Sequence, residues 1–404
     1  MMRVLIADKF EKVGTEGLKD LGCEVVERAE VKADDLPGVV RQVDPKILIV
    51  RSKKVSEAAL KEGARLSLVI RAGAGIDSID VAAASRLGIF VSNCPGKNSI
   101  AVAELVMGLL LSCDRRIPDQ VIELRRGEWN KGEYSKARGL HGRILGIVGL
   151  GQIGREIAKR ALAFGMKVVA WSRQLTIEEC QRLGIEYAQT PLEVARLADA
   201  ISINVASTSE TKGMVNAEFL AAMKPGAYLL NTARGSVIDE AGLLEAIATK
   251  RIRCGLDVYQ GEPGGAKGTI DSPLAKSPGV FGTHHVGAST EQAQVAIAHE
   301  VLRIVQQFAE TGQPLHCVNR LAKSSATHLL AVRHQNRPGV LAHVFKVLAD
   351  EEINVEEVEN IAYHGAAAAS ARIHVSGAPS DRAVAEIMGG NPDVISVDLR
   401  EVRR

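Results

Sequence analysis

Aromatic side chains are scarce in this chain, at 3% of 404 residues, which argues against a nucleic-acid surface built on stacked rings. Fifty basic residues nearly balance 48 acidic ones, so neither an extended phosphate-binding face nor an anionic-membrane surface is expected. The six cysteines are scattered without a Cys-x-x-Cys pair, which favours reduced thiols over a metal cluster or a disulfide scaffold. The most apolar run, Ile100–Cys113, contains Glu104 and is too short to span a bilayer. The start of the chain has no signal-peptide pattern, so we expect a cytoplasmic protein. The spacing of the cysteines leads us to expect no bound metal.

The residues that are present are those of an ordinary globular protein, with 46% apolar and 24% charged side chains, and the length allows two or three domains. Over the first hundred residues, short apolar runs alternate with amphipathic segments. This alternation predicts a doubly wound parallel sheet. The expected strands lie at 4–7, 24–26, 47–50, 69–71 and 89–91. A long apolar helix is expected to follow, from about Ser99 to Ser112.

A second alternating unit begins at Ile144. Its expected strands lie at 144–148, 168–171, 200–205, 228–231 and 255–259. A helix is expected over 291–311, and the pattern then weakens at 311–325 into Gly, Pro and Ser, which indicates a linker.

The last 78 or so residues have a separate pattern of strands and helices, which indicates a small domain. Strands are expected at 329–332, 355–362, 369–375 and 394–399, and helices over 338–350 and from about 380 to 390. Pro338 is expected in the first turn of its helix, since proline is tolerated there. The resulting βαββαβ order predicts a ferredoxin-like sandwich.

The segment Gly149-Leu150-Gly151-Gln152-Ile153-Gly154 lies where an apolar strand turns into an amphipathic helix. Gly149 permits the tight turn, Gly151 lets the backbone approach a pyrophosphate, and Gly154 lets the helix pack against the strand. The free N–H groups of the first helical turn, at Gln152 and Ile153, favour phosphate. The side chains expected to face inward from this helix are Ile157, Ala161 and Phe164. The pattern predicts a nicotinamide dinucleotide site.

The next strand ends in Ser172-Arg173, where a dinucleotide site of this kind usually has an acidic residue for the adenosine ribose. A carboxylate would repel a 2′-phosphate, whereas serine and arginine can accept one. NADP is therefore as credible as NAD. The alternative is that Arg173 is a solvated surface charge and NAD binds without the usual carboxylate.

Three later segments carry groups that suit the oxidation of a 2-hydroxy acid. Arg234 follows a strand, Asp257 and Glu262 lie near the end of another, and His285 comes after both. A guanidinium can bind a carboxylate in bidentate fashion, and a His–Glu pair can move a proton near neutral pH. Each residue alone has an ordinary structural interpretation, but their order after a dinucleotide motif is more specific.

With these segments the chain resembles the D-isomer-specific 2-hydroxyacid dehydrogenase family over almost its whole length. The motifs that carry the resemblance are Arg71–Asp77, Asn98–Glu104, Gly149–Gly154, Asn231–Gly235, Asp257–Pro263 and His285–Thr290. The resemblance implies that His285 is the general acid/base, Glu262 its carboxylate partner and Arg234 the substrate clamp. It implies further cofactor contacts at Val205, Ala206, Thr232, Ala233, Asp257 and Gly287. His284 stands where the family usually has proline, which leaves its role open.

The resemblance also implies a domain organisation. A Rossmann nucleotide-binding domain at 98–286 would be inserted in a flavodoxin-like substrate domain made of 1–97 and 287–322, followed by a regulatory domain at 327–404.

The substrate interpretation depends on additional positive charge. The family fold makes Gly73-Ala74-Gly75 a backbone N–H nest for the substrate carboxylate. Arg51 and Arg71 match positions where the phosphoglycerate dehydrogenases of the family bind phosphate, which favours oxidation of 3-phosphoglycerate in serine synthesis.

Two alternatives stay open. Asn204 and Ala206 stand where the family often has histidine and proline, and with Ser172-Arg173 they point toward NADP-linked glyoxylate or hydroxypyruvate reductases. A non-enzymatic corepressor that binds dinucleotide on the same scaffold is less favoured, because Arg234, Glu262 and His285 are all in register.

The C-terminal segment resembles an ACT domain, a small regulatory fold that binds amino acids. By that resemblance His334, Asn336 and Asn354 would bind L-serine, since amide and imidazole groups suit a zwitterion. The alternative is a sandwich that only joins subunits. In either case a homodimer or homotetramer is expected.

Overall fold

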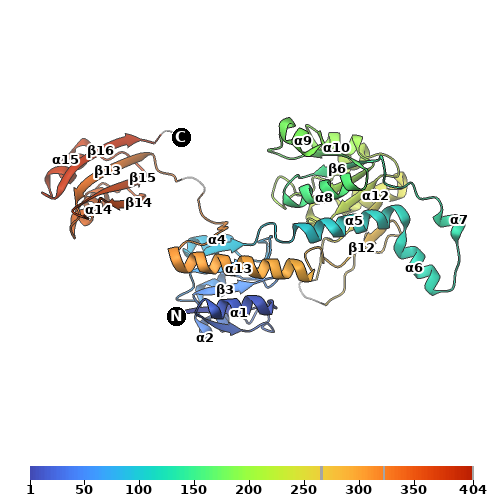
Figure 1. Cartoon of the computed structure of the whole chain (residues 1–404), viewed down its shortest axis with the longest axis horizontal. Helices are drawn as coiled ribbons and strands as arrows, with labels where there is room; N and C mark the ends of the chain where they lie inside the picture. Colours follow the sequence, from blue (N-terminus) through green and yellow to red (C-terminus); the bar gives the residue numbers. More distant parts are fainter. Residues whose placement is uncertain (264–266, 322–323, 403–404) are drawn as a thin grey trace. The chain divides into compact units, whose positions relative to one another are not determined.

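The computed structural model describes residues 1–263, 267–321 and 324–402, which separate into two compact units, Met1–Asn319 and Arg320–Arg404. Figure 1 traces the elements from the N-terminus to the C-terminus. Three short segments of the expected domains and linker lie outside the described residues, namely 264–266, 322–323 and 403–404.

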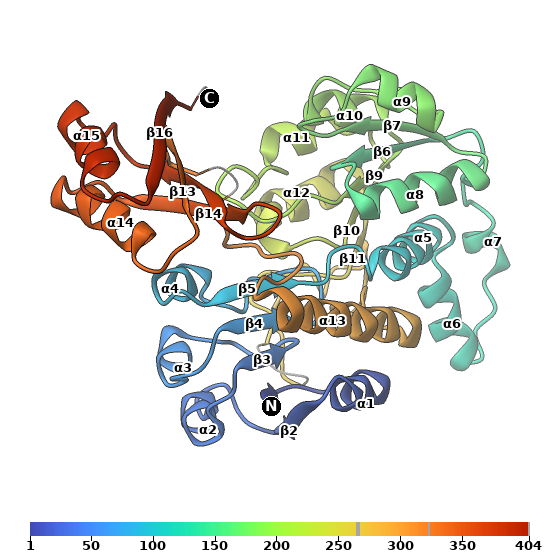
Figure 2. The ribbon, with the colours of Figure 1, turned by 60° about the vertical axis from the view of Figure 1, so that its left-hand side comes forward.

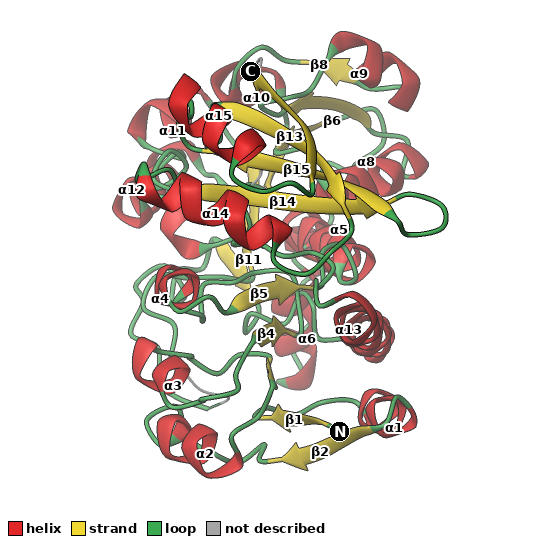
Figure 3. Ribbon diagram, turned by 90° about the vertical axis from the view of Figure 1, so that its left-hand side faces the viewer, coloured by secondary structure: helices red, strands yellow, loops and turns green. Residues whose placement is uncertain are grey.

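The first sheet is parallel, and its strand order is β2-β1-β3-β4-β5, which is the flavodoxin-like order. Its strands are β1 (Met2–Ile6), β2 (Cys23–Glu27), β3 (Ile47–Val50), β4 (Leu68–Arg71) and β5 (Phe90–Asn93). Its helices are α1 (Lys12–Asp20), α2 (Leu36–Val43), α3 (Glu57–Lys61), α4 (Val81–Arg86) and the returning α13 (Glu291–Thr311). Figures 2 and 3 show α2, α3 and α4 on one face and α1 with α13 on the other, so that both faces bury apolar side chains.

The second sheet is also parallel, with the order β12-β11-β10-β9-β6-β7-β8, the doubly wound order of a Rossmann domain. Its strands are β6 (Ile144–Val148), β7 (Lys167–Trp171), β8 (Glu186–Tyr187), β9 (Ala200–Ile203), β10 (Tyr228–Asn231), β11 (Arg253–Leu256) and β12 (Val280–Gly282). Helices α5 (Ser99–Arg115), α8 (Gln152–Ala163) and α9 (Ile177–Leu183) supply the core of one face. Helices α10 (Pro191–Leu197), α11 (Ala217–Ala222) and α12 (Glu240–Lys250) supply the other. Two short helices, α6 (Ile117–Arg125) and α7 (Lys131–Tyr134), follow α5, and the 3-10 turn η1 (Gly235–Val237) follows β10.

The C-terminal unit is a four-stranded antiparallel sheet in the order β14-β15-β13-β16. Its elements are β13 (His328–Gln335), α14 (Val340–Asp350), β14 (Val355–Ala362), β15 (Ala368–Val375), α15 (Asp381–Gly389) and β16 (Val394–Glu401). Helices α14 and α15 cover one face of the sheet and share a core with it (Figure 3). The βαββαβ sandwich expected from the sequence is confirmed, and its topology is compatible with an ACT-like domain.

The structure contains two strands that the sequence did not predict, β8 and β12, and four other positions differ from expectation. Helix α14 starts at Val340 behind Gly339, whose φ of +90° sets the cap, so Pro338 precedes the helix instead of lying in its first turn. Strand β9 ends at Ile203 and strand β11 at Leu256, because loops that carry candidate site residues begin there. Phe164, expected inside, is 44% exposed because it is the C-cap residue of α8.

Candidate active site

The candidate site residues of the first unit lie at the carboxyl ends of parallel strands. The glycine turn follows β6, Ser172 follows β7, Arg234 follows β10 and Asp257 follows β11. In the first sheet, Arg51 follows β3, and Arg71 ends β4. Because parallel strands share an edge at their carboxyl ends, each sheet presents its group of side chains along one edge.

The glycine turn has the geometry that a pyrophosphate requires. Gly149 has a φ of +97°, and a Cβ there would lie 2.7 Å from the carbonyl oxygen of Asn204. A Cβ at Gly154 would lie 2.4 Å from the carbonyl oxygen of Gly149, so close packing of α8 on β6 requires glycine. At Gly151, which caps α8, a Cβ would meet no described protein atom within 4 Å. The helix N-terminus therefore faces open space, and this cradle fits a dinucleotide phosphate.

The two residues of the first helical turn have protein contacts of their own. A Cβ at Gly96 would overlap the side-chain oxygen of Gln152, so Gln152 packs closely on the segment that precedes α5. Ile153 is partly buried against the apolar core of that face. Their contact with a dinucleotide stays a prediction.

At the predicted adenosine end of the site, the structure adds a carboxylate that the sequence analysis did not identify. Glu210, in the loop after β9, accepts a hydrogen bond from the Thr208 hydroxyl, and that bond is the main cause of its lowered pKa. The positive charge of Arg173 lowers the pKa of Glu210 further, which brings Arg173 within electrostatic range of this carboxylate. The surroundings of Arg173 are therefore mixed in charge. The only signal in the sequence was an acidic residue in the loop after the fourth strand of the unit.

Two asparagines shape the loops beside the glycine turn. The Asn204 side chain accepts from the Ser202 hydroxyl at 3.2 Å and donates to the Ser202 carbonyl at 3.1 Å, so it folds back on its own strand end. The buried Asn231 side chain donates to the Arg234 carbonyl and accepts from the Ala233 N–H, at 2.9 and 3.0 Å. These bonds close the turn that contains Thr232 and Ala233 and fix the backbone from which Arg234 extends. Val205 and Ala206 continue the loop after Asn204, and their predicted cofactor contacts are not tested by these bonds.

The imidazole of His285 and the carboxylate of Glu262 are brought together although they lie 23 residues apart, with Nδ1 and Oε2 at 2.6 Å. Glu262 also accepts the Tyr259 N–H at 2.7 Å, which fixes its orientation. The hydrogen bond to Glu262 raises the pKa of His285 despite its partial burial. Burial alone would raise the pKa of Glu262, but the bonds from His285 and Tyr259 outweigh it and lower that pKa. A protonated imidazole is therefore stabilised, as a general acid/base requires.

Asp257 holds the histidine loop. Its buried carboxylate accepts from the Thr283 hydroxyl at 2.6 Å and from the N–H groups of Val286 and Gly287, both at 2.8 Å. Its carbonyl accepts the N–H of His285, whose φ of +53° marks a sharp turn. These bonds take most of the acceptor capacity of Asp257, so its main structural role is to position His285. A direct contact between Asp257 and nicotinamide stays a prediction. His284 lies exposed beside this turn.

Arg234 reaches across from the second sheet to the segment after β4. Its Nε and Nη2 both donate to Oδ2 of Asp77, at 2.9 and 2.6 Å, and its Nη1 donates to the Ala233 carbonyl at 2.7 Å. Its positive charge also lowers the pKa of both His285 and Glu262, so the guanidinium is within electrostatic range of the pair. The three predicted catalytic residues are therefore gathered at one place.

Arg71 and Arg51 add positive charge to the same place. Burial lowers the pKa of Arg71 most, and the charges of Arg234 and Arg51 lower it further. Within the described residues, Arg71 has no hydrogen bond or ion pair to another side chain. Arg51 Nη2 lies 3.5 Å from the Ser289 hydroxyl, and the Arg51 backbone N–H donates to Asp8 at 2.8 Å. Arg71 therefore lies within electrostatic range of two other guanidinium groups, and such surroundings favour an anion.

The glycine loop after β4 makes room for two of these guanidinium groups. A Cβ at Gly73 would overlap Nη1 of Arg71, and one at Gly75 would lie 2.3 Å from Nη2 of Arg234. The predicted nest is only partly available, since the Gly73 N–H already donates to the Arg71 carbonyl at 2.8 Å. Among the described residues, no hydrogen bond engages the N–H of Ala74 or Gly75. The Ala74 carbonyl is held by the Asn93 side chain at 2.6 Å.

The three predicted serine ligands are not brought together in one chain. His334 is 2% exposed, and its ring contacts the Gln335 carbonyl at 2.8 Å and the Asn360 side chain at 3.2 Å. Asn336 follows β13 at the end of β15 that begins with Ala368, whereas Asn354 precedes β14 at the other end. The length of β15, eight residues, separates these ends by about 25 Å. A single serine molecule cannot contact both asparagines of one chain.

Two features are absent from the described part of the chain. No group of three or more potential ligand side chains there is arranged to hold a metal ion. None of its helices is both long and apolar enough to cross a membrane.

Comparison with known proteins identifies the family. The family model for the NAD binding domain of D-isomer specific 2-hydroxyacid dehydrogenases matches residues 107–287. The D-3-phosphoglycerate dehydrogenase of Bacillus subtilis is 38% identical over 321 residues, which cover 79% of this chain and 59% of that protein. The hydroxypyruvate reductase of Thermotoga maritima is 37% identical over 312 residues, which cover 77% of this chain and 98% of that protein.

A solved structure has the same architecture. The NADPH-dependent glyoxylate/hydroxypyruvate reductase of Sinorhizobium meliloti matches with a TM-score of 0.69 and 30% identity, over 79% of this chain and 98% of that one. The chain spans less than two thirds of the length of the phosphoglycerate dehydrogenase from Bacillus subtilis. It aligns with nearly the full length of the two reductases. The chain belongs to the D-isomer specific 2-hydroxyacid dehydrogenase family.

Proposed function

We propose that the chain is a dehydrogenase that oxidises D-3-phosphoglycerate to 3-phosphohydroxypyruvate in L-serine biosynthesis. The observation that carries the proposal is the grouping of Arg71 and Arg234 at the Gly73–Gly75 loop, with Arg51 within electrostatic range of Arg71 and Arg234 within electrostatic range of the Glu262–His285 pair. The substrate has a carboxylate and a phosphate, and guanidinium groups bind both through paired hydrogen bonds. An uncharged or singly charged substrate would leave part of this cationic cluster without a partner.

The residues of the chain can carry the proton side of this reaction. A nicotinamide dinucleotide, when bound, takes the hydride from C2 of the substrate. Nδ1 of His285 donates to Glu262, so Nε2 is the nitrogen left to accept the proton of the substrate hydroxyl as the carbonyl forms. Arg234 binds the substrate carboxylate and stabilises the charge that develops on the oxygen. In the reverse direction the protonated imidazole returns that proton.

A second function, reduction of glyoxylate or hydroxypyruvate with NADPH, has an observation in its favour. Ser172 and Arg173 stand at the adenosine end without the carboxylate that would repel a 2′-phosphate. The nearby Glu210 opposes this preference, since it offers Arg173 a negative partner. The choice of cofactor and the choice of substrate are therefore to be measured together.

The deciding experiment is a steady-state matrix of NAD and NADP against 3-phosphoglycerate, phosphohydroxypyruvate, hydroxypyruvate and glyoxylate, followed at the absorbance of reduced nicotinamide. We expect kcat/KM to be at least about tenfold higher for phosphohydroxypyruvate than for hydroxypyruvate, because a charged hydrogen bond contributes about 1.5–3 kcal/mol. Equal values would favour the reductase. No turnover with any of the four, together with dinucleotide binding by calorimetry, would favour a corepressor-like protein.

L-serine is the proposed effector of the C-terminal unit, in a homodimer or homotetramer of a cytoplasmic protein. Since Asn336 and Asn354 lie at opposite ends of one sheet, a serine site that uses both would combine residues of two chains. His334 could take part only by giving up bonds that it now makes within the unit. Calorimetry with serine on the intact protein tests this proposal, and Asn336→Ala and Asn354→Ala should each abolish the binding heat.

A further inference from the structure

Asp77 is the acidic side chain that meets the proposed substrate clamp. It lies in the segment between β4 and α4, and its Oδ2 accepts both Nε and Nη2 of Arg234, at 2.9 and 2.6 Å. The two residues are 157 positions apart in the chain and belong to different sheets. The contact therefore joins the substrate side and the dinucleotide side of the site.

The hydrogen bonds of Arg234 use its donors unequally. Nε has one hydrogen, which Asp77 accepts, while Nη1 and Nη2 have two each. Nη2 gives one hydrogen to Asp77, and Nη1 gives one to the Ala233 carbonyl. One hydrogen on each terminal nitrogen remains, so the end of the guanidinium keeps a fork that a carboxylate can bind through both oxygens. Asp77 occupies the side of the group and leaves this end available.

The cationic surroundings explain why Arg234 needs such a partner. After burial, which has the largest effect, the charges of Arg234 and Arg51 both lower the pKa of Arg71, so Arg71 and Arg234 repel each other. Asp77 acts in the opposite direction on that pKa, so its charge is felt across the cluster. Without Asp77, like-charge repulsion would favour rotation of the Arg234 side chain away from Arg71.

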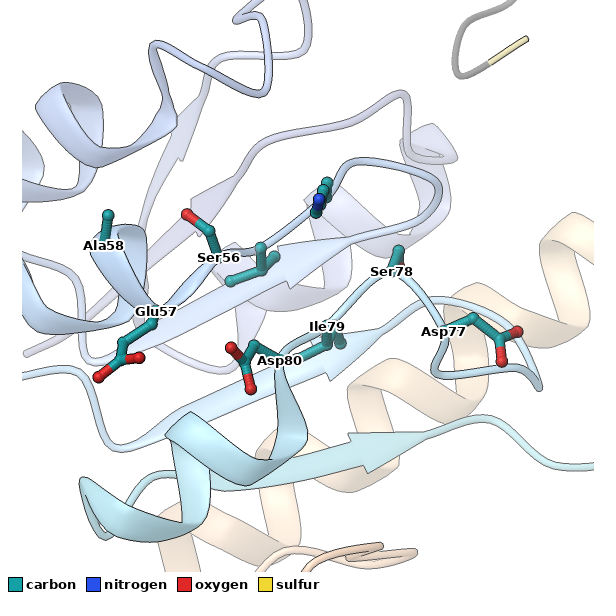
Figure 4. Close-up of a pocket in the computed structure, with 9 residues that line it drawn as sticks. Ser56, Glu57, Ala58, Asp77, Ser78, Ile79 and Asp80 are labelled. Carbon is teal, nitrogen blue, oxygen red and sulfur yellow. The ribbon is translucent and has the colours of Figure 1, made fainter. Parts of the chain in front are cut away.

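Asp77 also lines an open pocket of about 480 Å³, together with residues 54–58 and 78–80. Figure 4 shows the Asp77 carboxylate directed away from Glu57 and Asp80, which line the pocket with it. With these acidic groups and a single lysine, Lys54, the pocket has the wrong charge for an anionic substrate. The orientation of Asp77 is thus accounted for by Arg234 and not by the pocket.

We propose that Asp77 is a positioning residue that holds Arg234 in the orientation needed to bind the substrate carboxylate. The inference rests on the proposed role of Arg234 as the clamp. It applies to any 2-hydroxy acid, since every such substrate carries the same carboxylate. The alternative is that Asp77 occupies the substrate carboxylate's place on Arg234, in which case the substrate would have to displace Asp77.

The test compares Asp77→Asn with Asp80→Asn, a matched control on the same segment. Asp80 accepts the Ala83 N–H as the cap of α4, and asparagine can keep that bond. For Asp77→Asn we expect KM for 3-phosphoglycerate and for hydroxypyruvate to rise about tenfold, with kcat changed less than about threefold, because a charge-assisted pair becomes neutral. Asp77→Glu should recover part of the loss, and Asp80→Asn should leave KM within about twofold.

A second comparison separates positioning from general damage to the fold. In an Arg234→Ala background, Asp77→Asn should have no further effect on KM, since the residue acts through Arg234. Additive losses would overturn the proposal, as would an unchanged KM in Asp77→Asn. A lower KM in that variant would show that Asp77 competes with the substrate.

A binding measurement separates this proposal from the proposed function. Oxalate presents a carboxylate without needing turnover, and its Kd can be measured by calorimetry in the presence of dinucleotide. We expect Asp77→Asn to weaken oxalate binding about tenfold relative to Asp80→Asn. If the wild type turned over none of the four substrates but this difference held, the proposed function would fail and the positioning role would stand. Equal Kd values would overturn the positioning role alone.

Discussion

At the scale of single residues, the proposed proton-transfer group is held in place by neighbouring side chains. Nδ1 of His285 is fixed by Glu262 at 2.6 Å, and the turn on which the histidine sits is fastened to Asp257 by three hydrogen bonds to its carboxylate. The imidazole is left with one nitrogen for the substrate, and the preferred tautomer is set by Glu262. Rate and pH dependence should therefore respond to Glu262 as well as to His285.

The first prediction concerns the pH dependence of Glu262→Gln. Glu262 raises the pKa of His285, so in the wild type the imidazole stays protonated to higher pH and substrate oxidation rises as pH passes through that raised value. In Glu262→Gln the charge is lost, the pKa of His285 falls, and the midpoint of the kcat/KM profile should move to lower pH. A profile of kcat/KM between pH 5 and pH 10 checks this.

His285→Ala is the companion variant, and it should lower kcat by about 10²–10⁴ and remove the midpoint altogether. An unchanged midpoint in Glu262→Gln would contradict the assigned pair. So would a His285→Ala variant that kept the wild-type profile.

The second prediction concerns Arg71, which has no partner among the described side chains of the first unit. Arg71→Ala should lower kcat/KM for 3-phosphoglycerate about 10- to 100-fold, since a charged hydrogen bond to the phosphate is lost. The value for hydroxypyruvate, which lacks the phosphate, should change less than about threefold. Arg65→Ala is the matched control, because Arg65 pairs with Asp44 on the surface near the start of β4. Equal losses on both substrates would argue against a phosphate site at Arg71.

At the scale of elements, α13 contains a buried carboxylate that links the segment before α5 to the segment after α13. Glu300 is 1% exposed and meets Lys97 at 2.9 Å, Arg303 at 3.0 Å and His316 at 2.7 Å. Lys97 precedes α5, and His316 lies in the segment that follows α13. Burial alone would raise the pKa of Glu300, but the bonds from Lys97 and His316 outweigh it and lower the pKa to about 2.

The third prediction concerns the stability that this cluster contributes. Glu300→Gln should lower the free energy of unfolding of the first unit by about 2 kcal/mol, because Lys97, Arg303 and His316 lose a common partner. Since the folded pKa of Glu300 is depressed, its contribution is full above the ordinary value near 4.5 and is lost as pH falls toward 2.

Urea denaturation at pH 7 and at pH 3.5 measures this contribution, and the difference between wild type and variant should shrink at the lower pH. Glu310→Gln is the control, because Glu310 lies exposed on the same helix and bonds only to Gln306 in the described structure. An equal effect of the two substitutions would contradict the buried cluster.

At the scale of the whole molecule, each unit has a core of its own. The apolar clusters of the two parallel sheets belong to the first unit, and the cluster of the antiparallel sheet belongs entirely to the second. Asn319 closes the first unit, since its side chain accepts the Val91 N–H at 2.8 Å and donates to the Ile89 carbonyl at 2.9 Å. The proposed catalytic residues all lie before this point.

The fourth prediction is that a chain ending at Leu321 keeps the dehydrogenase activity. Its kcat/KM should stay within about threefold of the full chain, because independent cores fold separately. Any inhibition by L-serine in the full chain should disappear in the shortened one. The measurement is a serine titration of initial rates for both chains. Loss of all activity, with the circular dichroism of the fold retained, would show that the C-terminal unit completes the active site.

Much of this protein was predictable from the sequence because the relevant signals are local. The apolar runs predicted most strand positions within a few residues, although β8 and β12 were not predicted. The glycine turn was recognisable because Gly149, Gly151 and Gly154 have separate steric roles within one turn. The errors were local as well. Gly339 and not Pro338 sets the start of α14, and Phe164 is exposed because a helix end carries it out of the buried face.

The partners of these residues were decided by tertiary structure, because they join positions that the chain does not bring close by itself. Strand order aligns the sheet edges so that Asp77 meets Arg234, and the packing of α13 buries Glu300 among cations. The same sheet order separates Asn336 from Asn354, which sequence motifs alone had grouped in one site. Local patterning therefore determined the elements and the reacting groups, whereas long-range packing decided which of them meet and what holds them in place.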